Sequence, residues 1–336
     1  MKKILALLVL SVAMVSCYEE YLLDYPYTSI YFYLQQDVRT FVLGEGQQFK
    51  VGATLGGVRE NTRDRAISYT LDNSLINAYR LDRMQFASQA YIRDATAGLA
   101  ALQLLPASYY TVSDNSTITI PSGYHTGTVT ITATDAFIND SVNTCRKSTY
   151  VLPFRLTGAD ADSLLYAKRT NVVGTMFENK LFGNYWHGGA ALVNRASNPN
   201  PFQRADTTIR YKTTVPTLEN LIWSLTTTGP TTLTCNGYYN TQVAAGKRFF
   251  KIVLKGSNVY LSAGPDAIPG YTFAPDGESS FNNAKLLQDR KLILKYSLTQ
   301  TAAPNFVYHC TDTLTFRNRI RDGINEWQDE NEANYY

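Results

Sequence analysis

The sequence predicts an all-β chain of two domains: a β-sandwich that carries a short helical excursion, then a larger β-sandwich or barrel-like domain. Short runs rich in β-branched and aromatic residues alternate with turn residues along most of the chain, which is the pattern of antiparallel sheets. The 24 tyrosines also favour strands. A length of 336 residues with 44% hydrophobic content is ample for two cores.

The first 17 residues have the organisation of a bacterial lipoprotein signal. Lys2 and Lys3 precede an apolar stretch, as in secretory signals, and this stretch is shorter than the ~20 residues that span a bilayer. Cys17 follows Met14-Val15-Ser16, which resembles the lipobox, where the cysteine is diacylated and becomes the new N-terminus. We expect Cys17 to be lipidated. The alternative is an ordinary signal that is cut elsewhere.

Residues 18–28 would form a tether that spans at most roughly 40 Å. The tether begins Tyr18-Glu19-Glu20. An acidic pair behind the lipidated cysteine resembles the export signal that sends Bacteroidetes-type lipoproteins to the outer face of the outer membrane. We therefore expect a protein that is lipid-anchored in the outer membrane and exposed at the cell surface.

Residues 29–158 are predicted to form the first sandwich. Strands are expected at 30–33, 47–51, 66–71, 117–120, 128–133 and 150–156. Residues 74–101 interrupt them with short helices, for which Asp72 or Asn73 would supply the N-cap. The small, polar residues 158–163 indicate the domain boundary.

Residues 164–330 are predicted to form the second all-β domain. Strands are expected at 171–177, 207–212, 219–225, 248–254, 259–261, 291–298 and 307–316. Turn clusters such as Thr228-Gly229-Pro230 and Pro275-Asp276-Gly277 separate these strands.

The charge balance argues against nucleic acid or an anionic membrane surface as the partner. Loss of Lys2 and Lys3 reduces the 31 basic residues to 29, against 28 acidic ones, which leaves a net charge of +1. Electrostatic attraction to a polyanion needs a larger or more concentrated positive charge.

Three cysteines remain besides Cys17: Cys145, Cys235 and Cys310. One disulfide can form in an oxidising compartment, with Cys235–Cys310 favoured because both residues lie in the second domain. Three inert free thiols are the alternative. The three histidines are too dispersed for a metal motif, so we expect neither a metal nor a cofactor.

Several phrases of the first domain resemble a known family. They are Tyr25-Pro26, Val51-Gly52-Ala53-Thr54-Leu55-Gly56-Gly57, Leu105-Pro106-Ala107-Ser108-Tyr109-Tyr110-Thr111, Ile120-Pro121-Ser122-Gly123 and Tyr150-Val151-Leu152-Pro153. Together they resemble the N-terminal Ig-like domain of unknown function found on Bacteroidetes outer-membrane lipoproteins. In that family, the domain accompanies glycan-binding modules, and sometimes a chitinase-like barrel, in starch-utilisation-type loci. The resemblance implies an Ig-like sandwich.

The second domain resembles the module of unknown function that often follows. The matching phrases are Gly183-Asn184-Tyr185-Trp186-His187-Gly188-Gly189 and the stretch from Asp312 to Trp327. This resemblance implies a surface protein of a glycan-uptake locus and leaves the ligand open.

No catalytic motif is recognisable. A family-18-type glycosidase needs Asp-x-x-Asp-x-Asp-x-Glu, and sandwich glycosidases place their carboxylates as Glu-x-Asp-x-Glu on one face of a strand. Neither pattern occurs, and Gly-x-Ser-x-Gly, P-loop and His-Glu-x-x-His motifs are also missing. We expect no enzyme activity.

The remaining candidates are residues that suit sugar binding, because sugars present apolar C–H faces ringed by hydroxyl groups. The first candidate group is Asn184, Tyr185, Trp186 and His187, beside two glycines, and the second is Tyr238 and Tyr239. Both groups could instead be strand residues that pack a core.

Two other aromatic positions are assigned to structure. Trp223 lies on an alternating strand and is expected in the core. Near Trp327, a charged segment is expected to form an ion network that sets conformation, rather than a ligand site; it comprises Arg317, Arg319, Arg321, Asp322 and Glu326.

The sequence thus predicts a non-catalytic surface lipoprotein whose second, lectin-like domain binds oligosaccharide for an outer-membrane transporter complex, with the first domain as a spacer. Holding the sugar near a transporter would raise its effective concentration. Two alternatives stay open. One is a structural or adhesive envelope protein with protein–protein modules, and the other is an accessory glycoside hydrolase.

Overall fold

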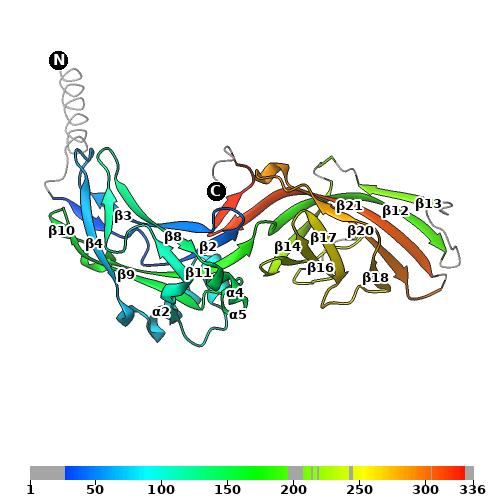
Figure 1. Ribbon diagram of the computed structural model, residues 1–336, viewed down its shortest axis with the longest axis horizontal. Coiled ribbons are helices and arrows are strands. Elements are labelled where there is room, and N and C mark those ends of the chain that lie inside the picture. The colour runs from blue at the N-terminus through cyan, green and yellow to red at the C-terminus, as the bar shows by residue number, and fades with distance from the viewer. Residues whose placement is uncertain are drawn as a thin grey trace, which may run out of the picture.

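The computed structural model describes residues 27–195, 207–212, 215–217, 219–241, 245–303 and 305–329. Two β-domains follow one another along the long axis of the molecule (Figure 1). The signal, Cys17 and most of the expected tether lie outside the described residues. Within the described part, none of the helices is long and apolar enough to cross a membrane.

The first domain consists of two sheets. The first sheet contains β1 (Ser29–Tyr31), β3 (Gln48–Gly56), β6 (Tyr110–Val112), β8 (Thr126–Ala133) and β10 (Ser163–Leu164). The second sheet contains β2 (Gln36–Leu43), β4 (Arg65–Leu71), β5 (Gln103–Leu104), β7 (Thr117–Ile120), β9 (Tyr150–Ala159) and β11 (Thr170–Asn179). Buried side chains from both sheets share one core, so the expected all-β sandwich is confirmed.

Strand periodicity explains which faces are buried. Along β4, buried and exposed side chains alternate, so that Ile67 and Tyr69 enter the core and Ser68 faces outward. The turn spacing predicts purely antiparallel pairing, but the observed pairing is mixed. β1 pairs with β10, β2 with β11 and β5 with β9 in parallel, and each of these pairs has the long connection that a parallel pair requires.

The helical excursion covers the outer face of the second sheet. The short helices of the first domain are η1 (Asn73–Leu75), α2 (Ala78–Gln85), α3 (Ala90–Thr96), η2 (Ala107–Tyr109), α4 (Asp135–Asn139), α5 (Ser141–Thr144) and η3 (Tyr166–Lys168). Asp72 caps η1, as expected, whereas Asn77 caps α2. Leu81 and Met84 of α2 pack on Val38 and Val151 of the sheet. This small third core fixes α2 and α3 to the sheet.

The domain boundary differs from the expected one. β10 and β11, which we had assigned to the second domain, belong to the sheets of the first, where β11 lies between β2 and β9. The segment at 158–163 is the end of β9 followed by a turn at the sheet edge. Small, polar residues suit such a turn as well as they suit a linker. The first domain therefore ends at Asn179 rather than at 158.

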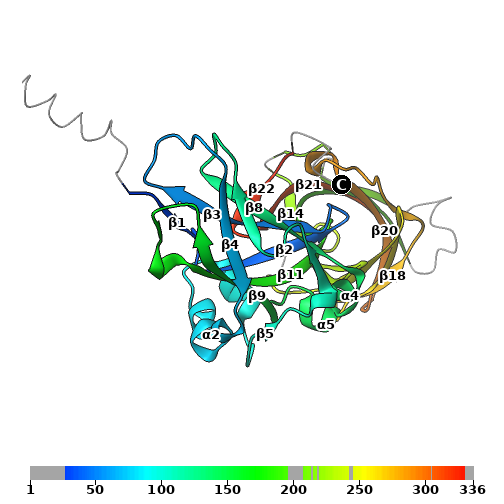
Figure 2. The same cartoon turned by 60° about the vertical axis from the view of Figure 1, so that its left-hand side comes forward.

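The second domain is a barrel. Its wall consists of β12 (Gly183–Arg195), β14 (Leu221–Gly229), β15 (Thr232–Cys235), β16 (Phe250–Lys255), β17 (Asn258–Ala263), β19 (Ser279–Phe281), β20 (Lys291–Gln300) and β21 (Phe306–Arg321). Each strand pairs with the next, and β21 pairs back onto β12, which closes the ring (Figure 2). The other elements are β13 (Thr207–Lys212), β18 (Tyr271–Pro275), η4 (Leu287–Asp289) and β22 (Ile324–Glu326).

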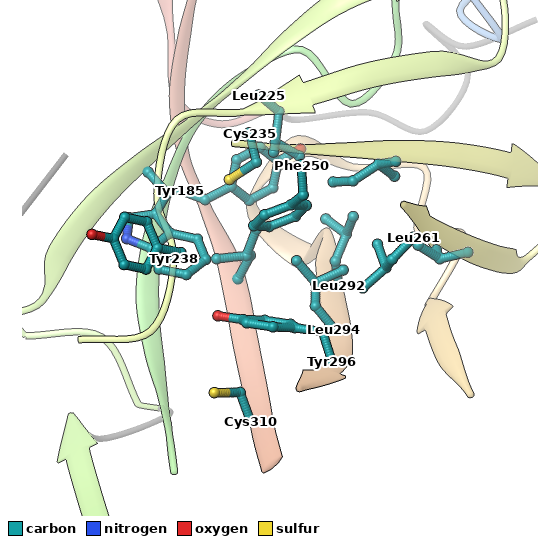
Figure 3. Packing of buried hydrophobic residues seen from close by; sticks show 14 of the residues in the cluster. Tyr185, Leu225, Cys235, Tyr238, Phe250, Leu261, Leu292, Leu294, Tyr296 and Cys310 are labelled. Carbon is teal, nitrogen blue, oxygen red and sulfur yellow. The ribbon is translucent and has the colours of Figure 1, made fainter. Parts of the chain in front are cut away.

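Side chains fill the barrel interior, as expected for a ring of this size. Phe250, Leu294 and Tyr296 belong to one buried cluster (Figure 3). Cys235 and Cys310 point into the same core, and both are free thiols, as is Cys145. Burial raises the pKa of the Cys235 and Cys310 thiols to about 12. The structure thus has three free thiols, which is the alternative to a Cys235–Cys310 disulfide, and a raised pKa makes a thiol less reactive.

A buried ion network joins the two domains. The Glu45 carboxylate, in the turn between β2 and β3, accepts both terminal nitrogens of Arg319 at 2.8 and 2.6 Å and lies 2.7 Å from Arg290 Nη2. Arg319 Nε also binds Glu326 at 2.6 Å, and Arg321 contacts the same carboxylate. Burial alone would raise the pKa of Glu45, but Arg319 and Arg290 outweigh it and lower the pKa.

The ion network predicted near the C-terminus is thus present, but two of its predicted members have other partners. Asp322 accepts the Thr40 hydroxyl at 2.7 Å and lies 3.7 Å from Arg39 Nη1, both in β2. Arg317 stacks on Trp186 instead of joining the network. The network connects domains, because its central carboxylate comes from a residue far earlier in the chain.

Candidate functional site

The first predicted group is divided between the two faces of β12. Tyr185 and His187 are fully buried in the barrel, whereas Asn184 and Trp186 face outward and are half-buried. This follows from the two-residue repeat of a strand, which turns neighbours to opposite faces. The structure therefore does not bring together the four side chains that the sequence groups as one candidate site.

His187 is the centre of a buried polar cluster. Its ring stacks on Trp223 with centroids 3.7 Å apart and lies 5.4 Å from the ring of Tyr211. Its Nε2 is 3.2 Å from the Asp312 carboxylate. Gly189 lies beside Asp312 across the β12–β21 ladder, and a Cβ there would lie 2.8 Å from Asp312 Oδ1. Gly189 thus gives room to a buried carboxylate rather than to a ligand.

Asp312 is held by three side chains. Tyr296 donates its hydroxyl to Oδ2 at 2.6 Å, and Tyr211 donates to Oδ1. Burial raises the pKa of Asp312 to about 6, and the hydrogen bond and charge of His187 oppose that rise. Both His187 and Asp312 have no exposed surface. We therefore interpret this cluster as part of the barrel core.

Trp223 is in the core, as predicted. His187 covers one face of its indole ring, and the backbone of Gly237 approaches so closely that a Cβ there would lie 2.3 Å from the ring. Only glycine allows this approach.

The second predicted group is also structural. Tyr238 is buried, with its ring edge-on to Phe249 at 4.9 Å. Tyr239 is half-buried between Tyr211 and Tyr308, and its backbone N–H donates to the Tyr296 hydroxyl at 2.7 Å. These packing contacts and the hydrogen bond account for the positions of both tyrosine side chains without a ligand.

The outward-facing residues of β12 have partners of their own. Asn184 accepts the Ser224 hydroxyl at 2.7 Å and donates to Asn318 at 3.3 Å. The guanidinium of Arg317 lies 5.0 Å from the centroid of Trp186, which is a cation–π distance. This arrangement occupies the face of Trp186 that would otherwise receive a sugar ring.

A different region has the geometry of a binding site. A groove with a volume of about 790 Å³ lies in the first domain, between α2 and the loop before β2. Its lining combines aromatic, amide and charged side chains: Leu34, Gln35, Gln36, Tyr79, Arg80, Asp82, Arg83, Phe86, Ala87, Ser88, Gln89 and Ala167. The volume is within the range of ligand pockets. We call this region the α2 groove.

Two exposed aromatic side chains project from the same face of the helix. Tyr79 is 65% exposed and Phe86 is 79% exposed. At 100° per residue, positions 79, 83 and 86 share one face of α2, and Leu81 and Met84 occupy the opposite face against the sheet. Burial of such a large aromatic side chain would stabilise the fold by about 1.5–3 kcal/mol. Exposure of two of them on one helix face is therefore a feature of a binding surface.

Hydrogen bonds fix the walls of the α2 groove. Gln36 Nε2 donates to the backbone carbonyl of Arg83 at 2.9 Å, and Arg80 donates to the Thr170 hydroxyl at 3.1 Å. Arg93 Nη1 donates to the carbonyls of Ala87 and Ser88 at 2.7 and 2.8 Å. These bonds join α2, β2, β11 and the α2–α3 connection, so the groove is preorganised.

A smaller groove of about 340 Å³ lies on the outer wall of the barrel. It contains His309, whose Nδ1 is 2.6 Å from Asp276, and Lys295. No aromatic side chain other than the His309 imidazole lines it, so it offers no indole, phenyl or phenol face to a sugar ring. In the described part of the chain, no group of three or more His, Cys, Asp or Glu side chains could hold a metal ion.

The α2 groove was not found from the sequence, although a signal for it exists. Tyr79 and Phe86 lie within the stretch 74–101 that the sequence predicts to be helical, and so do Leu81 and Met84. A helical wheel separates these two pairs onto opposite faces, which marks the first pair as exposed. What the wheel does not show is the opposite wall, which comes from residues 34–36 and Ala167.

Comparisons with known proteins agree with the fold. A family model described as an N-terminal domain matches residues 25–163, which is less than half of the chain. The chain is similar to a solved structure from Bacteroides ovatus described as of unknown function, with 19% identity, a TM-score of 0.59, and coverage of 91% of this chain and 99% of that one.

Two further structures from Bacteroides ovatus match with 12% and 13% identity and TM-scores of 0.40. One is described as of unknown function and the other as a multidomain protein that includes a domain of unknown function. No curated protein matches. The resemblance drawn from the sequence is thus supported as far as a protein similar to Bacteroides proteins with domains of unknown function.

Proposed function

We propose that this chain is a surface lipoprotein that captures oligosaccharide, without catalysis, in the α2 groove of its first domain. The observation that carries the proposal is the exposed pair Tyr79 and Phe86 on one helix face, beside amide and guanidinium groups. Aromatic faces receive the C–H faces of sugars, and the polar groups hydrogen-bond the hydroxyls.

The proposal reverses the roles expected of the two domains. The first domain, expected to be a spacer, carries the groove, and the barrel supports it. The ion network around Glu45 joins barrel and sandwich through buried contacts, so a ligand held by the first domain has a defined position relative to the second. The lipid anchor at Cys17 would place both domains at the outer membrane, where captured sugar is near a transporter.

Affinity gels that contain plant or host glycans would test the proposal with the soluble form of the chain that lacks residues 1–17. We expect the double variant Tyr79→Ala/Phe86→Ala to lose retention by a gel that retains the wild-type chain. Tyr124→Ala is the matched control, because Tyr124 is also 65% exposed but lies outside the groove. Trp186→Ala should likewise change nothing.

Three outcomes would contradict the proposal. Equal retention of the double variant and the wild-type chain would place the site elsewhere. Absence of retention on every glycan would favour the adhesive alternative, and release of reducing sugar would favour the accessory glycosidase.

A further inference from the structure

We propose that the ligand of the α2 groove is an anionic oligosaccharide, whose uronate or sulfate groups pair with Arg83 and Arg80. This inference rests on the function proposed above and adds the chemical class of the sugar. It goes beyond what the overall charge suggests, since that charge is nearly neutral.

Arg83 is an exposed cation without an acidic partner in the described structure. The Arg83 backbone carbonyl accepts a hydrogen bond from Gln36, and the Arg83 guanidinium has no ion pair with any described residue. Arg83 lies between Tyr79 and Phe86 on the exposed face of the helix and, like them, lines the groove. A planar guanidinium pairs with carboxylate or sulfate through two parallel hydrogen bonds.

Arg80 adds a second cation on the flank of the same helix. It is half-buried and donates to the neutral hydroxyl of Thr170 at 3.1 Å. Burial and the charges of Arg83 and Arg155 lower its pKa, which the Tyr79 side chain partly opposes. Arg155 itself pairs with Asp72. Arg80 is thus a cation beside other cations, and a bound anion would relieve that repulsion.

The lining residues contain a single carboxylate, Asp82, against these two arginines. The groove therefore has a local excess of positive charge next to its aromatic pair. Seven residues of helix separate Tyr79 from Phe86, which corresponds to ~10 Å along the axis. Both aromatics cannot stack on one sugar ring at that distance, so the ligand has several rings and an acidic group near Arg83.

Titration calorimetry with two matched ligand pairs would test the proposal. One pair is polygalacturonate and its carboxyl-reduced neutral form, and the other is dextran sulfate and dextran. We expect the mature chain to bind at least one of the acidic polymers and to bind its neutral counterpart much more weakly. Arg83→Ala should weaken acidic binding roughly tenfold or more, the effect of losing a charge-assisted pair, and Arg83→Lys should restore part of it.

Lys251→Ala is the control for non-specific attraction, because Lys251 is an exposed cation on β16, outside the groove. If it weakens binding as much as Arg83→Ala does, the proposed ion pair is refuted. Equal binding of a neutral polymer that depends on Tyr79 and Phe86 would refute the anionic class and leave the proposed function intact. If no polymer of either pair binds, while neutral glycan gels retain the chain, only the proposal of an anionic ligand is refuted. If the neutral glycan gels do not retain the chain either, the proposed function is refuted as well.

Discussion

Replacing Glu45 with glutamine should strongly destabilise the barrel and separate its unfolding from that of the sandwich. Glu45, Arg290 and Arg319 are all almost completely buried, and the Glu45 carboxylate makes three contacts of 2.6–2.8 Å with the two guanidinium groups. The substitution leaves two buried cations with one less anion. Arg319 keeps Glu326, and Arg290 keeps backbone carbonyls, so we expect the loss for one broken buried pair, about 3–5 kcal/mol.

Urea unfolding is suited to measure this loss, because urea does not screen charges. All three tryptophans lie in the second domain, so tryptophan fluorescence reports barrel unfolding and far-UV circular dichroism reports both domains. With a denaturant slope of ~3 kcal/mol per M, the fluorescence midpoint should fall by about 1–1.7 M urea. The two signals should also cease to coincide, since the domains lose their common buried contact.

Arg63→Gln is the control, because the Arg63–Asp160 ion pair is largely solvent-exposed. It should change stability by less than about 1 kcal/mol. If Glu45→Gln shifts the fluorescence midpoint no more than Arg63→Gln does, the interpretation of Glu45 as the buried link between the domains is wrong.

Three further predictions concern the core and the anchor. Asp312 keeps its proton in the folded state up to about pH 6, whereas in the unfolded chain it ionises near its ordinary pKa of about 4. The free energy of unfolding of the wild-type chain should therefore fall relative to that of Asp312→Asn as the pH rises from about 4 to about 6, by about 2–3 kcal/mol. Chemical denaturation of both chains at several pH values measures this difference. A difference that does not change with pH would show that the carboxyl titrates normally. Gly237→Ala should lower the melting temperature through a clash with Trp223, with a cost of about 1–3 kcal/mol for overpacking; an unchanged melting temperature would mean that the backbone there moves freely. Radiolabelled palmitate should be incorporated into the wild-type chain in cells and not into Cys17→Ser, and label in that variant would place the acyl chain elsewhere.

Strand positions were predictable where a two-residue alternation coincides with β-branched residues. β4, β7 and β13 begin and end within one residue of the expected positions. β2 was missed, because its sequence contains adjacent buried residues at Asp37-Val38 and again from Thr40 to Val42, and such a strand lacks the alternation. β2 is covered on both faces, by the sandwich core on one side and by α2 and α3 on the other.

The candidate site illustrates a different limit. The segment from Asn184 to Gly189 contains aromatic, polar and glycine residues of the kind that binds sugar. The same composition serves a buried polar cluster in which His187, Tyr211 and Tyr296 surround Asp312. Whether such residues face a ligand or a core depends on which face of the strand is enclosed, and that is decided by the closure of the barrel through the β12–β21 pairing.

By itself, the sequence determined the class of the fold, the place of the helices between β4 and β5 and the presence of a charged cluster near the C-terminus, because these depend on local spacing and on residue type. The tertiary structure alone decided where the first domain ends, that Glu45 completes the charged cluster, and that residues 34–36 and Ala167 form the wall of the groove opposite Tyr79 and Phe86. Each of these depends on contacts between segments that are distant in the chain, for which no local periodicity carries a signal.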